Sequence, residues 1–148
     1  HYSELGFKGI GLGDTTGMAT PPIVRLAVKY LQDTLPELPI GLHFHNTRGL
    51  GLVNVMAGLD EGIDQFDASF GGIGGCPFAP KATGNICTED LVYLLHEMNI
   101  DTGIDLQALM TIATQVETVV GHNLPGQVMK AGPRLDLHSM TSVATAQG

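Results

Sequence analysis

The chain has 148 residues, 43% of them hydrophobic, which is enough for one domain with a modest core. Lysine and arginine together number 7 and aspartate and glutamate 15, so the formal net charge is −8. An acidic surface argues against nucleic acid and membranes as main partners, and no apolar run approaches the roughly 18 residues of a transmembrane helix.

The cysteine content indicates a reducing compartment. Cys76 and Cys87 are the only cysteines and form no CxxC motif, which predicts neither a disulfide framework nor a zinc ribbon. No signal-peptide pattern opens the chain, so we expect a cytoplasmic protein. The lack of an initiator methionine suggests a processed or partial polypeptide.

Apolar runs of strand length alternate with segments of helical period, a pattern typical of βα units around a parallel sheet. The first strand is expected over 8–13, followed by a turn over 14–17. A helix is expected from its N-cap, Thr20, to a break at Pro36. Its apolar stripe, predicted to face the core, consists of Ile23, Leu26, Ala27, Tyr30 and Leu31.

The second βα unit follows directly. Its strand is expected from Pro39 to Phe44 or His45, and its helix over 49–59, with Gly62 as the stop. One face of this helix is predicted to carry Leu52, Val55, Met56 and Leu59.

The third strand is expected over 65–70 and leads into a glycine-rich segment, 71–80. That segment is long for a βα loop, which predicts a functional role. Thr88 is the expected N-cap of the next helix, with acidic residues in its first turn that suit the helix dipole. The positions expected to face inward in this helix are Leu91, Leu94, Leu95 and Met98.

The C-terminal part contains one more predicted helix, opened by Asp105 and ending near Val120. Residues 1–148 are expected to form one partial domain, within which 121–148 are a C-terminal extension. We expect residues 142–148 to be mobile.

A pair of histidines ends the second strand. Side chains two apart on a strand project from the same face, so His43 and His45 are expected to lie side by side, about 7 Å apart at Cα. That spacing suits two neighbouring positions on one metal ion. The alternative is a pair of polar residues that cap loop carbonyls.

Functional residues in parallel α/β sheets collect at the carboxyl ends of the strands. This rule brings Asp14, the two histidines, Cys76 and Asn85 to one rim. Two imidazoles, an amide oxygen and a carboxylate could hold a divalent cation as a Lewis acid.

Each of these residues has a second interpretation. Asp14 could close its own turn, Cys76 could be a small apolar residue rather than a reactive thiol, and Asn85 could serve helix entry. Cys87 is expected to pack in the core. The remaining histidines with a surface prediction are His96, His122 and His138.

Several motifs, in this order and spacing, resemble those of the 3-hydroxy-3-methylglutaryl-CoA lyases. They are LGDTTG at 12–17, HFHNTRG at 43–49, GGCPFA at 74–79, TGN at 83–85 and TEDLV at 88–92. The wider metal-dependent aldolase and lyase barrel family shares the paired histidines and the Gly-Asn step but not the cysteine loop. Asn46 and Arg48 depart from the usual His-Asp-Thr-Tyr-Gly, which suggests a branch that acts on a related acyl-CoA or hydroxy acid.

The resemblance implies an α/β fold of the (β/α)₈ TIM-barrel type, of which this chain supplies the last three βα units and the helices after them. It implies that His43, His45 and Asn85 bind a divalent metal, Mg²⁺ or Mn²⁺. Cys76 would be the catalytic thiol and Asp14 an acid/base or substrate-orienting carboxylate. The strand that carries the Arg-Asp pair of the family has no counterpart here.

The implied activity is cleavage of a 3-hydroxy-3-methylglutaryl-CoA-like substrate to acetyl-CoA and acetoacetate, a step of leucine catabolism. The implied partners are an acyl-CoA substrate and either a second copy of the chain or the missing half of the barrel. Alternatives are a related aldolase or acyl-CoA-using synthase, or an inactive partial barrel that acts as an assembly module. A zinc hydrolase using His43, His45 and Cys76 is disfavoured, since no Glu neighbours the histidines as in H-E-x-x-H.

Overall fold

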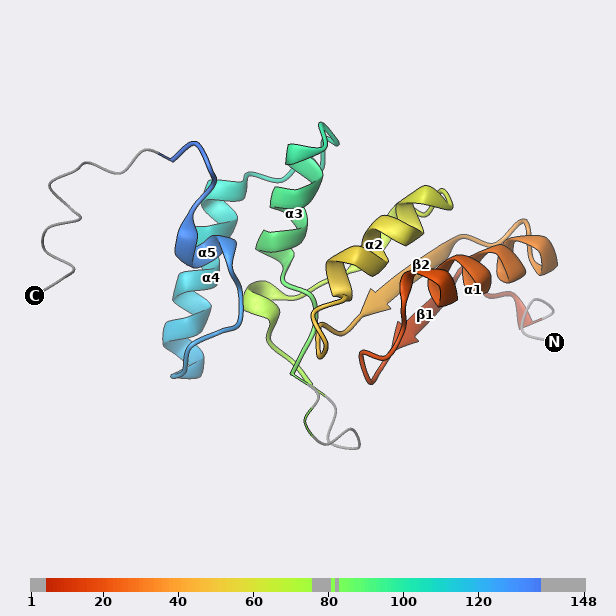
Figure 1. Ribbon diagram of the computed structural model, residues 1–148, viewed down its shortest axis with the longest axis horizontal. Coiled ribbons are helices and arrows are strands. Elements are labelled where there is room, and N and C mark those ends of the chain that lie inside the picture. The colour runs from red at the N-terminus through yellow and green to blue at the C-terminus, as the bar shows by residue number, and fades with distance from the viewer. Residues whose placement is uncertain (1–4, 76–80, 82, 137–148) are drawn as a thin grey trace, which may run out of the picture.

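The computed structural model describes residues 5–75, 81 and 83–136 (Figure 1). Three strands alternate with helices, and further helices follow the last strand. In chain order the elements are β1 (Ile10–Asp14), α1 (Pro21–Thr34), β2 (Ile40–Phe44), α2 (Gly51–Asp60), β3 (Gln65–Asp67), the 3₁₀ helix η2 (Phe70–Gly72), α3 (Thr88–Glu97), α4 (Leu106–Val120) and α5 (Val128–Ala131).

The strands form one parallel sheet in the order β1-β2-β3, with Ile10 opposite Ile40 and Gly41 opposite Gln65. This confirms the predicted βα alternation. The third strand is shorter than the predicted 65–70, because the chain enters a 3₁₀ turn in which Gly71 adopts a left-handed conformation (φ 57°).

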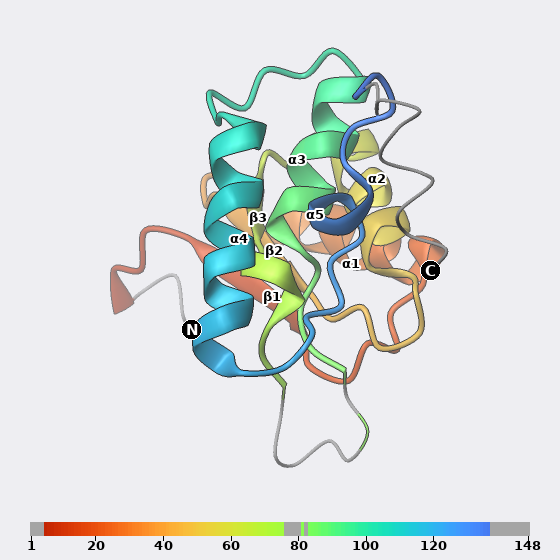
Figure 2. The ribbon, with the colours of Figure 1, turned by 90° about the vertical axis from the view of Figure 1, so that its left-hand side faces the viewer.

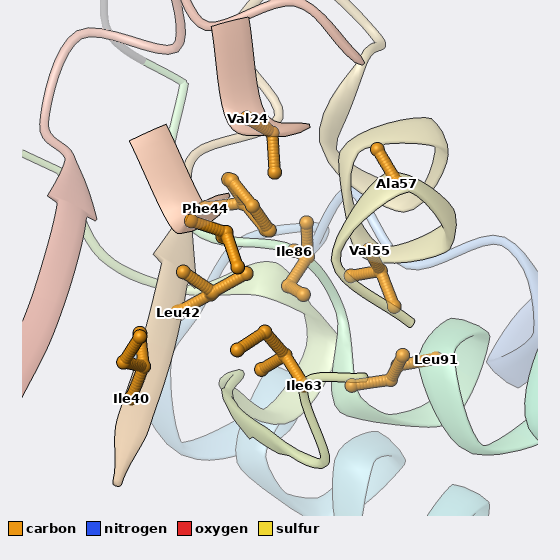
Figure 3. Packing of buried hydrophobic residues seen from close by; sticks show 10 residues of the cluster. Val24, Ile40, Leu42, Phe44, Val55, Ala57, Ile63, Ile86 and Leu91 are labelled. Carbon is orange, nitrogen blue, oxygen red and sulfur yellow. The ribbon is translucent and has the colours of Figure 1, made fainter. Parts of the chain in front are cut away.

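One face of the sheet carries the core. Ile40, Leu42 and Phe44 alternate along β2, are each at most 7% exposed, and pack with residues of the two helices α1 and α2 (Figure 3). Both helices lie on this side of the sheet (Figure 1). Because neighbouring strand residues point to opposite faces, His43 lies on the other face of the sheet.

The outer side of α1 is uncovered, which corrects the predicted core stripe. Val24 and Val28 are buried, whereas Ile23, Leu26 and Tyr30 are 55%, 72% and 66% exposed. Sequence period identifies which residues share a face of a helix but not whether a neighbouring element covers that face.

Both edges of the sheet adjoin open grooves. A groove of about 360 Å³ lies between β1 and α1 and is almost wholly apolar. A second, of about 600 Å³, lies beside β3 and α3. Within the described residues each outer strand has one unpaired edge.

The predicted helix ends are partly correct. Gly62 (φ 81°) follows α2 in a Schellman arrangement in which its N–H donates to Leu59 O and that of Ile63 to Gly58 O. The Asp105 side chain caps α4 by accepting from Ala108 N at 3.0 Å.

Two details of the helix predictions are wrong, and the predicted N-cap of α1 is correct. Cys87, not Thr88, is the N-cap of α3, since Thr88 already has helical geometry. Thr20 is the N-cap of α1, as predicted, although its side chain makes no capping hydrogen bond. Met98 is 36% exposed because it follows the last residue of α3 rather than lying on its inner face.

The helices α3, α4 and α5 pack against one another (Figure 2). The short helix α5 lies within the segment 121–148, which the sequence predicts only as an extension. Residues 142–148, predicted to be mobile, lie outside the described residues. No helix in the described part is long and apolar enough to cross a membrane.

The change Leu42→Ala, at a side chain that is 2% exposed, is expected to lower the free energy of unfolding by about 3 kcal/mol, because apolar burial is lost and a cavity is left. The matched change Leu26→Ala on α1, at a side chain that is 72% exposed, should cost less than about 0.5 kcal/mol. Urea unfolding of the 148-residue chain measures both. Equal losses would contradict the exposed position of α1.

Candidate metal and catalytic site

The two histidines lie together at the carboxyl end of β2, as predicted. Their ring centroids are 5.2 Å apart with an interplanar angle of 59°. The His43 side chain is 34% exposed, and its Nδ1 lies 3.7 Å from Oδ2 of Asp67, its register partner on β3. His45 is only 6% exposed. The pair therefore combines one accessible and one buried imidazole on a common face.

Asn85 lies directly opposite His45. The two residues form an antiparallel bridge, flanked by hydrogen bonds from Asn46 N to Gly84 O (3.0 Å) and from Ile86 N to Phe44 O (3.1 Å). This pairing brings the third predicted ligand to the end of β2.

The polar atoms around this pairing fit a cation. Asn85 Nδ2 donates to Ile73 O at 2.9 Å, so Oδ1 is the atom of this amide that could bind a metal. Asn85 Oδ1 and His45 Nδ1 are both buried and have no hydrogen-bond partner in the described part of the chain. Buried polar atoms are normally satisfied, so these two atoms without a partner at one site fit a bound cation.

The donor set is nevertheless incomplete by itself. Within 5–75, 81 and 83–136, no three His, Cys, Asp or Glu side chains converge on a possible metal position. Two imidazoles and one amide oxygen are ligands that Mn²⁺ accepts, and the remaining positions would need oxygen atoms from other groups.

Burial lowers the pKa of His45, the charge of His43 lowers it further, and Asp14 partly opposes both effects. The neutral imidazole, which is the form that binds metals, is thereby favoured at neutral pH.

Asp14 closes the turn after β1. Its Oδ1 accepts from Met18 N at 2.9 Å and its Oδ2 from Ala19 N at 3.1 Å, so the turn contact that the sequence left open is present. In the strand register Asp14 pairs with Phe44, on the face opposite to His43. An ionised carboxylate has about four lone-pair sites, so these two bonds leave acceptor capacity. Its acid/base role stays a prediction.

The loop that follows β1 is hydrogen-bonded to the loop that follows β2. Arg48 Nη1 donates to Thr16 O at 2.9 Å and to Gly17 O at 3.1 Å. Gly17 (φ 61°) lies so close to Thr47 that an added Cβ would be 2.7 Å from the Thr47 Cβ. Asn54, buried in α2, donates to Ala19 O at 3.0 Å.

The structure describes only one of the two cysteines, Cys87. Cys76 lies outside the described residues, so its predicted role as catalytic thiol stays a prediction. Cys87 is buried, as expected, and burial together with its hydrogen bond to Glu89 raises the pKa of its thiol far above neutral pH. Cys87 is therefore an unreactive core residue.

Two residues near the site were missed by the sequence. Asp67 follows from the rule that selected His43, since it ends the next parallel strand. The sequence predicts Glu89 to be an acidic residue that suits the helix dipole, yet it is fully buried and accepts from Gly71 N at 2.9 Å. Sequence position alone gives no signal for such a tertiary contact. The predicted surface position of His122 is correct, whereas His96 is partly buried and contacts Thr102 Oγ1 at 2.9 Å.

A titration difference should reveal the environment of His45. Because its pKa is lowered on folding, the unfolded chain binds a proton more readily, so the free energy of unfolding falls as pH drops through the ordinary value of about 6.5. His45→Gln should show a weaker fall between pH 7.5 and 5.5 in metal-free urea unfolding. The other titrating groups are common to both proteins, so equal slopes would contradict the lowered pKa.

The sequence is similar to one protein family and to several characterised proteins. The family described as HMGL-like matches residues 1–116. The (R)-citramalyl-CoA lyase of Chloroflexus aurantiacus is 47% identical over 133 residues, covering 90% of this chain and 42% of that protein. The hydroxymethylglutaryl-CoA lyase YngG of Bacillus subtilis is 44% identical over 124 residues, covering 84% of this chain and 42% of that protein.

Solved structures agree. An HMG-CoA lyase from Acinetobacter baumannii, in complex with coenzyme A and 3-methylmalate, superposes with a TM-score of 0.89 at 51% identity and covers 95% of this chain and 46% of that one. The Bacillus subtilis HMG-CoA lyase gives a TM-score of 0.82 at 42% identity, covering 88% and 44%. The chain thus spans less than half the length of these relatives. It belongs to the HMGL-like family and has the α/β fold of the HMG-CoA lyase barrels.

Proposed function

We propose that this chain is part of a metal-dependent carbon–carbon lyase that cleaves a 3-hydroxy-3-methylglutaryl-CoA-like thioester to acetyl-CoA and acetoacetate. The observation that carries the proposal is the pair of orphaned ligand atoms, His45 Nδ1 and Asn85 Oδ1, beside His43 at a strand end. Membership of a family whose relatives are acyl-CoA lyases gives the chemistry of the substrate.

The chain would supply the last three βα units of a (β/α)₈ barrel. Two observations support this placement: both outer strands have an unpaired edge in the described residues, and both edges adjoin open grooves. A single barrel domain typically has about 250 residues, and the relatives are about twice as long as this chain. The missing strands, or a second copy of the chain, would then cover the exposed face of α1.

His43, His45 and Asn85 would hold a divalent cation, Mg²⁺ or Mn²⁺. Such a cation, when bound, supplies Lewis-acid polarisation of the substrate hydroxyl and carboxylate oxygens. Asp67 would orient the His43 ring through its 3.7 Å contact with Nδ1, as carboxylates do behind many metal-bound histidines.

The protein groups would handle the protons. A base, Asp14 or one of the histidines, removes the proton from the tertiary hydroxyl of the substrate. The C–C bond breaks, its electron pair passes to the acetyl-CoA enolate, and the former hydroxyl carbon becomes the ketone of acetoacetate. Cys76 then donates a proton to the enolate carbon. A low pKa of His45 keeps that imidazole neutral in its assigned role as ligand.

The acyl group is the least constrained part of the proposal. One relative is named for citramalyl-CoA and another for hydroxymethylglutaryl-CoA, at 47% and 44% identity. Both names describe hydroxy-acyl thioesters, so both compounds are substrates to test. We further propose a cytoplasmic location, in keeping with the acidic composition and the paucity of cysteine.

The lyase assay uses the complete polypeptide that carries this sequence, with Mg²⁺ or Mn²⁺ and each thioester. Release of acetyl-CoA should require the cation. Cys76→Ala should lower turnover by at least about a hundredfold, the contribution of a general acid, while Mn²⁺ binding is retained. His43→Ala should lose Mn²⁺ binding, whereas the matched control His96→Ala, on α3 and bonded to Thr102, should not.

Unchanged turnover in Cys76→Ala would remove the lyase mechanism in favour of another aldolase-type reaction. Retention of Mn²⁺ binding in His43→Ala would remove the metal assignment instead.

A further inference from the structure

A carboxylate with no solvent exposure holds the turn that follows β3. Glu89, in the first turn of α3, is 0% exposed. Gly71 N donates to its Oε2 at 2.9 Å and to its Oε1 at 3.2 Å, and the Cys87 thiol donates to Oε2 at 2.9 Å. No ion pair to Glu89 is present among the described residues. Burying a carboxylate costs desolvation free energy, and the hydrogen bonds from these donors offset that cost.

Both backbone groups of Gly71 are held by tertiary contacts. Its N–H donates to Glu89, and its C=O accepts from Gly126 N at 3.0 Å. Its left-handed conformation (φ 57°) favours glycine, and an added Cβ would collide with the side chain of buried Leu124. Hydrogen bonds to Glu89 of α3 and to Gly126, between α4 and α5, therefore hold the start of the turn.

The other end of the same turn orients the Asn85 amide. Ile73 O accepts from Asn85 Nδ2 at 2.9 Å and from Ser69 Oγ at 2.6 Å. Because the amide group is planar, fixing Nδ2 also fixes Oδ1, the atom left without a hydrogen-bond partner in the described structure. A shift of Ile73 O would let the amide rotate.

We infer that Glu89 is a positioning residue for the Asn85 amide oxygen, acting through the Gly71 to Ile73 turn. The inference rests on the proposed function, since it concerns the readiness of that oxygen to bind a cation. Glu89 of α3 and Gly126, which both bind the backbone of Gly71, would thus help to assemble the site at the end of β2.

The test is a double-mutant cycle on Mn²⁺ affinity, measured by calorimetry on the complete protein without substrate. Glu89→Ala should weaken Mn²⁺ binding about tenfold, as loss of an orienting partner of a metal ligand commonly does. In an Asn85→Ala background the same change should have little further effect, because the coupling runs through Asn85. Glu89→Gln should restore most of the affinity, since its amide oxygen, in the place of Oε2, can accept from both Gly71 N and the Cys87 thiol.

Asp105→Ala is the matched control, because it also removes an acid from a helix N-terminus, in this case one whose side chain accepts from Ala108 N in α4. It should lower the melting temperature and leave Mn²⁺ affinity unchanged. If Glu89→Ala does not fold, Ser69→Ala perturbs the same carbonyl of Ile73 and should show the same non-additivity with Asn85→Ala.

Equal losses of Mn²⁺ affinity with and without Asn85 would overturn the inference alone, because the acid would then act through general stability. An unmutated protein that binds no Mn²⁺, or an Asn85→Ala variant that binds it normally, would overturn the metal assignment and the inference together.

Discussion

Beyond the last residue of β2 the chain pairs with the segment 84–86, which returns from the glycine-rich region. Ile86 N donates to Phe44 O and Asn46 N to Gly84 O, at 3.1 and 3.0 Å. Gly84 (φ 99°) allows the segment 84–86 to pass close to the glycine-rich turn, since an added Cβ would lie only 2.8 Å from the carbonyl oxygen of Gly74. These two hydrogen bonds set the register that puts Asn85 opposite His45, and the metal assignment depends on that register.

Hydrogen bonds hold the segments on both sides of this pairing. The loop after β1 is tied to the loop after β2 through Arg48, whose Nη1 donates to two carbonyl oxygens there. The turn after β3 is tied to α3 through Glu89. Ligand atoms held by supporting hydrogen bonds lose little freedom on binding a cation, which raises affinity without adding contacts. Burial also lowers the pKa of His45, and the neutral imidazole that results can bind a cation without first losing a proton.

Much of this arrangement could be predicted from the sequence because it depends on short-range rules. Alternation of apolar residues gave the three strands, and the two-residue spacing of His43 and His45 gave their common face. Tertiary facts were out of reach. The period of α1 could not reveal that Leu26 is 72% exposed, since that depends on what packs outside the helix. The burial of Glu89 arises from a contact with Gly71, which no local pattern encodes.

A crystal of the complete protein soaked in Mn²⁺ tests the central claim most directly, through the anomalous signal of the metal. The account predicts one strong peak within bonding distance of a ring nitrogen of His43, a ring nitrogen of His45 and Oδ1 of Asn85. A Mn²⁺ peak elsewhere in the barrel, with Asn85 Oδ1 unligated, would contradict it.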